Sequence, residues 1–180
     1  MKILKTLILF VEGADGVGKS TITRSLSKRL NLPVLKMLKA KVYFKKGRET
    51  IEEFSYIFNQ VLLQLKNTSY IVDRGPLSSL VYSEIYNRKS KLSYIYPLLR
   101  EIDPLILFLT TSETSILFER KKKDRVITIA DRLKILEGYE KFFKNQKLVR
   151  YLRINTAHKT PSQIVNEILK YLEEKKYIES

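Results

Sequence analysis

The feature that most constrains this chain is a glycine-rich stretch at residues 13–20, which satisfies the pattern G-x-x-x-x-G-K-[ST]. It follows an apolar run at residues 6–11 and precedes a helical pattern at residues 21–30. Glycines let successive backbone N–H groups turn inward around phosphate oxygens, and the following helix directs its free N–H groups at the same anion. The stretch therefore predicts a nucleoside triphosphate site formed by Gly13, Ala14, Asp15, Gly16, Val17, Gly18, Lys19, Ser20 and Thr21.

Two side chains of this stretch indicate a role in catalysis and metal binding as well as in phosphate binding. Lys19 supplies a mobile positive charge for the β- and γ-phosphates, so we expect it to be catalytic. The Ser20 hydroxyl can hold Mg²⁺, which indicates that the triphosphate is bound together with this ion. The alternative is a glycine-rich turn that binds no ligand.

Short apolar runs alternate with helical patterns along the rest of the chain. Further strands are expected at residues 32–38, 70–72, 105–109 and 147–155, and helices at residues 51–65, 76–87, 93–102, 129–144 and 160–175. Another helix is expected to begin at Ser112 or Glu113 and to end near Arg120. Alternating strands and helices are typical of a parallel sheet covered on both faces. We therefore predict a single domain, residues 1–180, with an α/β fold: a three-layer α/β/α sandwich around a mostly parallel five-stranded sheet.

An acidic and a basic residue, Asp73 and Arg74, directly follow the expected strand at residues 70–72. Ligands of such sheets bind at the carboxyl ends of the strands, so this pair should lie beside the glycine-rich stretch. A carboxylate there can hold Mg²⁺ through water, and an arginine can bind a second phosphate through two hydrogen bonds. We expect Ser20 and Asp73 to bind the metal and Arg74 to be catalytic. The alternative is a surface ion pair at the end of a strand.

A basic run at residues 120–125 lies between two expected helices and is too charged to belong to the core. Phosphoryl transfer concentrates negative charge on the γ-phosphate oxygens, and a mobile basic lid stabilises that charge and excludes water. We expect a short basic lid at residues 120–127, in which the guanidinium groups of Arg120 and Arg125 are the catalytic cations. The alternative is a solvated charged loop.

Composition narrows the classes of function. The chain has no cysteine and one histidine, His158, which excludes a disulfide framework, a thiol catalyst and a zinc–cysteine cluster. The net charge of +15 is spread along the chain and has three readings: a lysine-rich solvated surface, a positive cleft for a polyanionic substrate, or a nucleic-acid partner. We favour them in that order. The apolar run at residues 6–11 is too short to span a membrane, so we expect a cytoplasmic protein without a membrane partner.

Taken in order, these motifs resemble those of the thymidylate kinase family, within the P-loop nucleoside monophosphate kinases. The resemblance rests on residues 10–21, on Asp73-Arg74 with Ser78, Ser79 and Tyr82, on Arg120 with Asp124-Arg125, and on Glu137-Gly138-Tyr139. It implies a P-loop kinase fold and phosphorylation of dTMP to dTDP with ATP and Mg²⁺. It also implies that Asp15, an acid inside the glycine-rich stretch, approaches the acceptor sugar and contributes to catalysis. The lid should supply the catalytic cations, because Gly16 stands where some members of the family have an arginine.

The resemblance also implies which residues bind the acceptor nucleotide: Asp15, Arg74, Phe54, Phe58, Ser78 and Tyr82. Phe54 and Phe58 share a helix face, and we expect at least one aromatic side chain among Phe54, Tyr56 and Phe58 to stack on the base. This segment has no arginine to read the base, and Gly75 replaces the tyrosine that usually follows Asp-Arg in the family. The identity of the base and the preference for a deoxy sugar therefore stay open. We expect a homodimer.

A deoxynucleoside kinase is the nearest alternative. Its acceptor is a neutral 5′-hydroxyl, so it needs a general base, usually a carboxylate just after the second strand. That part of the chain has Lys36, Lys39 and Lys41, and no acid until Glu49, which favours an anionic monophosphate acceptor. A P-loop NTPase with a binding or regulatory role is less favoured, because the strand at residues 105–109 is followed by threonines rather than by a carboxylate.

Overall fold

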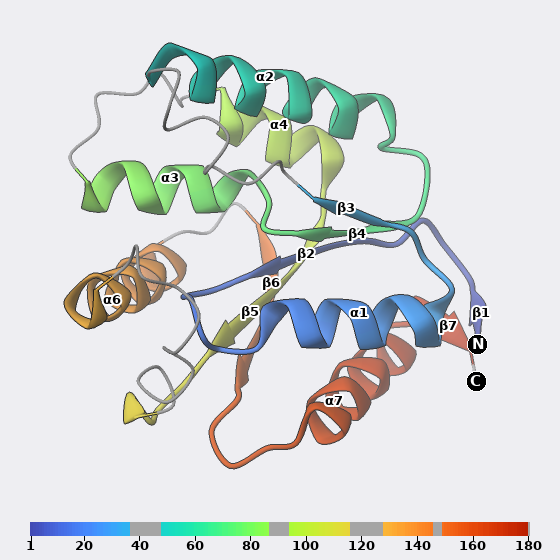
Figure 1. The fold of residues 1–180 in the computed structure, drawn as a ribbon. Coiled ribbons are helices and arrows are strands. Elements are labelled where there is room, and N and C mark those ends of the chain that lie inside the picture. Colours follow the sequence, from blue (N-terminus) through green and yellow to red (C-terminus); the bar gives the residue numbers. More distant parts are fainter. Residues whose placement is uncertain (37–47, 87–93, 116–127, 146–148, 180) are drawn as a thin grey trace.

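A parallel sheet of five strands runs through the molecule in the order β3-β4-β2-β5-β6 (Figure 1). The computed structural model describes residues 1–36, 48–86, 94–115, 128–145 and 149–179, without the side chains of residues 48–54 and 129. The five strands are β2 (Ile8–Glu12), β3 (Val34–Lys36), β4 (Tyr70–Asp73), β5 (Leu105–Thr110) and β6 (Arg150–Asn155), and every neighbouring pair is parallel. All residues of β2, β4 and β5 are buried, because a central parallel strand is covered on both faces.

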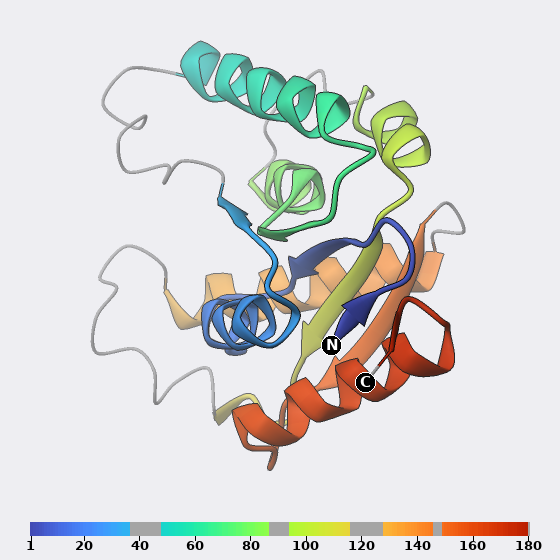
Figure 2. The ribbon, with the colours of Figure 1, turned by 90° about the vertical axis from the view of Figure 1, so that its right-hand side faces the viewer.

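Helices cover both faces of the sheet and complete three layers (Figures 1 and 2). One face carries α1 (Lys19–Leu30) and α7 (Pro161–Glu174), which pack against each other. The other carries α2 (Arg48–Gln64), α3 (Pro76–Ile85) and α4 (Ile95–Ile102), with α6 (Ile129–Asn145) packed beside α3. The predicted α/β/α sandwich with a parallel five-stranded sheet is confirmed. Within the described residues, no helix has the length and apolar character needed to cross a membrane.

Local signals explain why two of the helices begin where they do. The Thr160 hydroxyl accepts a hydrogen bond from the Gln163 N–H at 3.3 Å, and the Gln163 side chain accepts one from the Thr160 N–H at 2.8 Å. This reciprocal pair satisfies two N–H groups that a helix start leaves unpaired, and it fixes the first turn of α7. Pro76 opens α3, where its missing N–H costs nothing and its fixed φ suits the helix.

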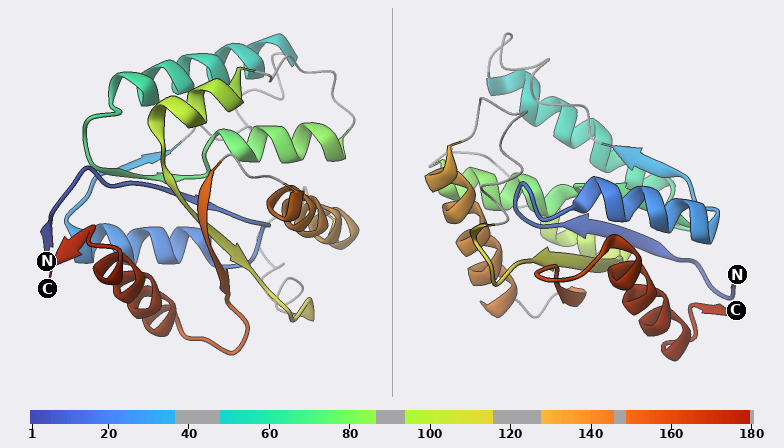
Figure 3. Two further views of the ribbon diagram at one scale, coloured as in Figure 1. Left: turned by 180° about the vertical axis from the view of Figure 1, so that it is seen from behind. Right: turned by 60° about the horizontal axis from the view of Figure 1, so that its bottom comes forward.

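Two features of the architecture differ from the prediction. The strand expected at residues 6–11 runs from Ile8 to Glu12, because the backbone of Glu12 still pairs with Phe108 of β5, and its buried carboxylate finds hydrogen-bond donors inside the protein. A second sheet joins β1 (Lys2–Ile3) and β7 (Ile178–Glu179) antiparallel and brings the two termini together (Figure 3). These strands have two residues each, which is too short for any periodicity in the sequence. The helix expected from residue 112 or 113 to Arg120 lies largely outside the described residues.

Candidate active site

The glycine-rich stretch forms a tight loop between β2, the central strand, and α1. Gly13 has φ 137°, and a Cβ atom at this position would lie 2.1 Å from the backbone oxygen of Leu109 at the end of β5. A side chain is therefore excluded both by the backbone conformation and by the close approach of β5. The loop leads into the first turn of α1, whose free N–H groups can bind an anion.

Lys19, the first residue of α1, is buried beneath this loop, with 6% of its surface exposed. Its ammonium group donates a hydrogen bond to the backbone oxygen of Ala14. Burial, followed by the nearby positive charge of Arg74, lowers the pKa of Lys19 to about 7. An anion in the loop would favour the charged form, so the side chain is suited to bind phosphate oxygens.

Ser20 and Asp73, the residues predicted to bind metal, are brought together at this edge of the sheet. The Ser20 hydroxyl donates a hydrogen bond of 3.1 Å to Oδ2 of Asp73, the last residue of β4. The donor set is a hydroxyl and a carboxylate, which suits Mg²⁺, a hard cation that prefers oxygen. No cluster of three or more histidine, cysteine, aspartate or glutamate side chains that could hold a metal occurs among the described residues.

Asp15, Arg74 and Tyr82 form a closed triangle next to the loop. The Arg74 guanidinium is paired with Asp15 and donates a hydrogen bond of 3.1 Å to the Tyr82 hydroxyl. That hydroxyl in turn donates to Asp15 at 3.0 Å. Although burial opposes ionisation, the charges of Arg74 and Lys19 lower the pKa of Asp15, so it is a carboxylate at neutral pH. Arg74 has φ 70°, an uncommon backbone conformation for a residue with a side chain that is often found at functional sites.

Glu12 was not predicted as a functional residue, although it lies at the centre of this region. It is fully buried and accepts hydrogen bonds from the Gly75 N–H at 2.9 Å and from the hydroxyls of Ser78 at 2.7 Å and Tyr139 at 3.0 Å. Burial raises the pKa of Glu12, against the effect of these hydrogen bonds. Its carboxylate thus connects the end of β2 to the turn after Arg74 and to α6. A charged residue directly after an apolar strand was the available signal in the sequence.

The same contacts explain two other positions. Ser78, predicted to bind the acceptor, has 5% of its surface exposed and lies against Glu12 and Tyr139. A Cβ atom at Gly75 would lie 2.8 Å from the Phe10 ring and 3.2 Å from the Glu12 carboxylate, so there is no space for the tyrosine that the resemblance implies. Arg132, on α6, is also buried and was not predicted, and its charge contributes to lowering the pKa of Asp15.

The structure describes only some of the remaining predicted site residues. Phe58 lies on α2, half-buried and packed against the core, and Tyr56 packs edge-on against Tyr94 with ring centroids 5.7 Å apart. The side chain of Phe54 lies outside the described part of the structure. Arg120, Arg125 and the whole expected lid at residues 120–127 are also outside it, so their roles stay predictions.

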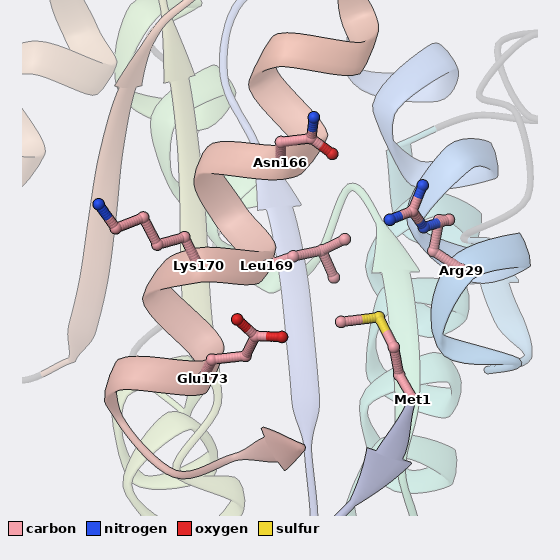
Figure 4. A pocket seen from close by; sticks show the side chains of 6 residues that line it. All are labelled: Met1, Arg29, Asn166, Leu169, Lys170 and Glu173. Carbon is pink, nitrogen blue, oxygen red and sulfur yellow. The ribbon is translucent and has the colours of Figure 1, made fainter. Parts of the chain in front are cut away.

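A surface pocket of about 320 Å³ lies away from this region, between α1 and α7 (Figure 4). Its lining includes Met1, Arg29 and Leu169. Arg29 is in the last turn of α1, whereas Lys19 begins the helix, so about 15 Å of helix separates this pocket from the glycine-rich loop. The pocket therefore takes no part in binding phosphates at that loop.

Comparison with known proteins gives a clear answer for the fold. No family model and no curated protein matches the sequence. The structure is similar to that of YorR from Bacillus subtilis, solved with phosphorylated GDP, with a TM-score of 0.70, 22% identity, and 96% of this chain and 99% of that chain covered. It is also similar to thymidylate kinase from Candida albicans, with a TM-score of 0.68, 19% identity, and coverage of 98% and 96%.

A third similar structure is deoxyadenosine kinase from M. mycoides, solved with dCMP and dCDP, with a TM-score of 0.66, 17% identity, and coverage of 94% and 100%. Shikimate kinase from Acinetobacter baumannii is similar too, with a TM-score of 0.67, 15% identity, and 97% of each chain covered. The three kinases among these proteins differ by name in the acceptor that they phosphorylate, and at such identities the likeness establishes architecture rather than substrate. The chain therefore has the α/β fold of the P-loop kinases.

Proposed function

We propose that this protein transfers the γ-phosphoryl group of ATP to the phosphate of a nucleoside monophosphate, with dTMP as the acceptor and dTDP as the product. One observation carries the proposal. Three basic side chains, those of Lys19, Lys36 and Arg74, lie at the same edge of the sheet, where β3, β4 and the glycine-rich loop meet. Two anionic substrates that must approach each other need cations at this place.

On the donor side, the glycine-rich loop and the start of α1 would bind the β- and γ-phosphates of ATP. Lys19 would leave the Ala14 carbonyl and pair with phosphate oxygens. Ser20 and Asp73 would hold Mg²⁺. The ion would supply positive charge next to the β- and γ-phosphates. These residues would orient the γ-phosphoryl group.

On the acceptor side, Arg74 is the residue that we assign to the monophosphate, because a guanidinium group can bind two phosphate oxygens at once. Asp15 would then be released toward the acceptor sugar, with Tyr82 beside it. An oxygen of the acceptor phosphate attacks the γ-phosphorus, a new P–O bond forms, and the bond to the ADP oxygen breaks. No proton has to be removed, because the attacking oxygen is already anionic.

A deoxynucleoside kinase is the second candidate, since a deoxyadenosine kinase has a similar fold. That reaction needs a carboxylate able to take a proton from a hydroxyl. Among the described residues near the loop, Glu12 is buried among its own donors, Asp73 contacts Lys36, and Asp15 is paired with Arg74, which lowers its pKa. None of the three is well placed as a base, which supports the monophosphate acceptor.

The test is a substrate panel with Mg²⁺ and ATP against each nucleoside monophosphate and each nucleoside, followed by chromatography of the products. We expect ADP and dTDP from dTMP, and no turnover by the Lys19→Ala variant. Faster phosphorylation of thymidine than of dTMP would favour the second candidate. ATP hydrolysis that requires no acceptor would refute both kinase assignments.

A further inference from the structure

Asp73 carries two contacts on a single oxygen. Its Oδ2 atom accepts the hydrogen bond from Ser20 at 3.1 Å, and the ammonium group of Lys36 lies 2.9 Å from the same atom. Lys36 and Asp73 are register partners in the parallel pair β3–β4, so the sheet places the two residues side by side. The Asp73 side chain is 7% exposed whereas that of Lys36 is 58% exposed, so the aspartate is fixed and the lysine approaches it from the solvent side.

The position of this ammonium group conflicts with metal binding. Ser20 and Asp73 are the residues that fit Mg²⁺, and Oδ2 is the atom that they share. An ammonium group and Mg²⁺ both seek the same carboxylate oxygen, and two cations at one oxygen repel each other strongly. Direct binding of the metal to Oδ2 would therefore displace the Lys36 ammonium group from Asp73.

We propose that Lys36 is a tethered competitor of Mg²⁺ at Asp73, and that Mg²⁺·ATP releases its ammonium group to the phosphate of the acceptor. The proposal rests on the kinase function above and specifies its acceptor as an anion. Lys36 ends β3 at the same edge of the sheet as Arg74, which directly follows Asp73. An ammonium group that leaves Asp73 there adds positive charge next to the arginine assigned to the acceptor phosphate.

This arrangement couples the two substrates. Because Lys36 can neutralise either Asp73 or an acceptor phosphate, the acceptor should bind more tightly after the metal has taken over Asp73. By reciprocity, the acceptor should also tighten the binding of Mg²⁺·ATP by the same factor. A hydroxyl acceptor without a phosphate would not show this coupling.

Two binding measurements on the Lys36→Met variant test the proposal without reference to turnover. The first is calorimetric titration of Mg²⁺·ATP into the protein without acceptor. Removing the competing ammonium should tighten this binding by about threefold to tenfold. The second is titration of dTMP in the presence of Mg²⁺ and a non-hydrolysable ATP analogue, where the loss of one cation should weaken binding by about tenfold.

Lys141→Met is the matched control, because Lys141 is also an exposed lysine in an ion pair, with Glu84 at 2.8 Å, but it lies on α6 away from the loop. It should leave both affinities unchanged. Weaker or unchanged binding of Mg²⁺·ATP by Lys36→Met would overturn the proposed competition, and unchanged binding of dTMP would overturn the role toward the acceptor. Failure of the wild-type protein to bind Mg²⁺·ATP would instead refute the kinase function itself.

Discussion

The Tyr139 hydroxyl donates a hydrogen bond of 3.0 Å to the Glu12 carboxylate, although 127 positions separate the two residues. Glu12 ends the central strand β2 and Tyr139 lies on α6, the helix that follows the expected lid. The Gly75 N–H, directly after Arg74, donates to the other oxygen of the same carboxylate at 2.9 Å. One buried carboxylate therefore connects α6 with the turn that carries the proposed acceptor-binding arginine.

Tyr139→Phe should weaken this connection without creating a cavity. The variant loses one donor to a buried carboxylate, while Ser78 and Gly75 still donate. We expect the free energy of unfolding in urea to fall by about 1–3 kcal/mol, the range for a buried polar group that loses a hydrogen-bond partner. Tyr96→Phe, at an exposed tyrosine of α4, is the control and should change it by less than about 0.5 kcal/mol. Equal effects of the two substitutions would contradict the assigned contact.

Glu12 should also give stability a characteristic pH dependence. Its pKa in the folded protein lies above the ordinary value of 4.5, so between these two values the folded state binds more protons than the unfolded state. Stability from Glu12 is therefore greatest below pH 4.5 and decreases as the pH rises through the folded-state pKa. The difference in unfolding free energy between wild type and Glu12→Gln should decrease over this window, by at most about 1.4 kcal/mol per pH unit. A difference that increases with pH would show that the pKa of Glu12 is lowered instead.

Lys19 should make ATP binding depend on pH. Its pKa of about 7 in the ligand-free protein means that it is mostly neutral at pH 9, whereas phosphate binding needs its charge. Binding must then take up a proton, so the dissociation constant of Mg²⁺·ATP should increase between pH 7.5 and 9, by at most about tenfold per pH unit. Calorimetry in buffers of different ionisation enthalpy measures the proton uptake directly. Lys19→Met should bind weakly and without this uptake, and the same uptake in the variant would assign it to another group.

Arg74→Lys tests the residue assigned to the acceptor phosphate. A lysine keeps the charge but cannot donate two parallel hydrogen bonds to one phosphate, as a guanidinium group does. We therefore expect kcat/KM for dTMP to fall by about 100-fold, while the affinity for Mg²⁺·ATP changes little. Arg150→Lys is the matched control: Arg150 binds Asp103 through two nitrogens, on the surface and away from the loop. The control should stay within about twofold of wild type. Similar rates for both variants would remove Arg74 from the proposed mechanism.

Arg120 and Arg125 test the expected lid. Because Gly16 supplies no cation to the transferred phosphoryl group, neutralising either arginine should lower kcat far more than it weakens acceptor binding. Arg120→Gln and Arg125→Gln are compared with Lys122→Gln, since lysines in this run are expected to remain solvated. An unchanged kcat in both arginine variants would mean that the run is a charged loop and that the catalytic cation lies elsewhere, for example at the buried Arg132.

Much of this protein is determined locally along its sequence. The glycine-rich loop, the buried strands β4 and β5 and the start of α7 depend on neighbouring residues: φ angles that glycine tolerates, continuous apolar runs, and the reciprocal hydrogen bonds of Thr160 and Gln163. Their order along the chain also predicts the sandwich, because parallel strands need helical crossovers on both faces. The position of Asp73 and Arg74 beside the glycine-rich loop could be predicted for the same reason, since the carboxyl ends of parallel strands meet at one edge.

Only the tertiary structure determines which side chains contact each other at the carboxyl edge of the sheet. Glu12, Ser78 and Tyr139 lie on three different elements, and no spacing in the sequence shows that one carboxylate accepts hydrogen bonds from both hydroxyls. The contact of Lys36 with Asp73 depends on the register of β3 against β4, and the pairing of β1 with β7 depends on the position of both chain ends. Burial of a charge is favourable only where distant segments supply its partners, so the role of such a residue is a property of the assembled fold.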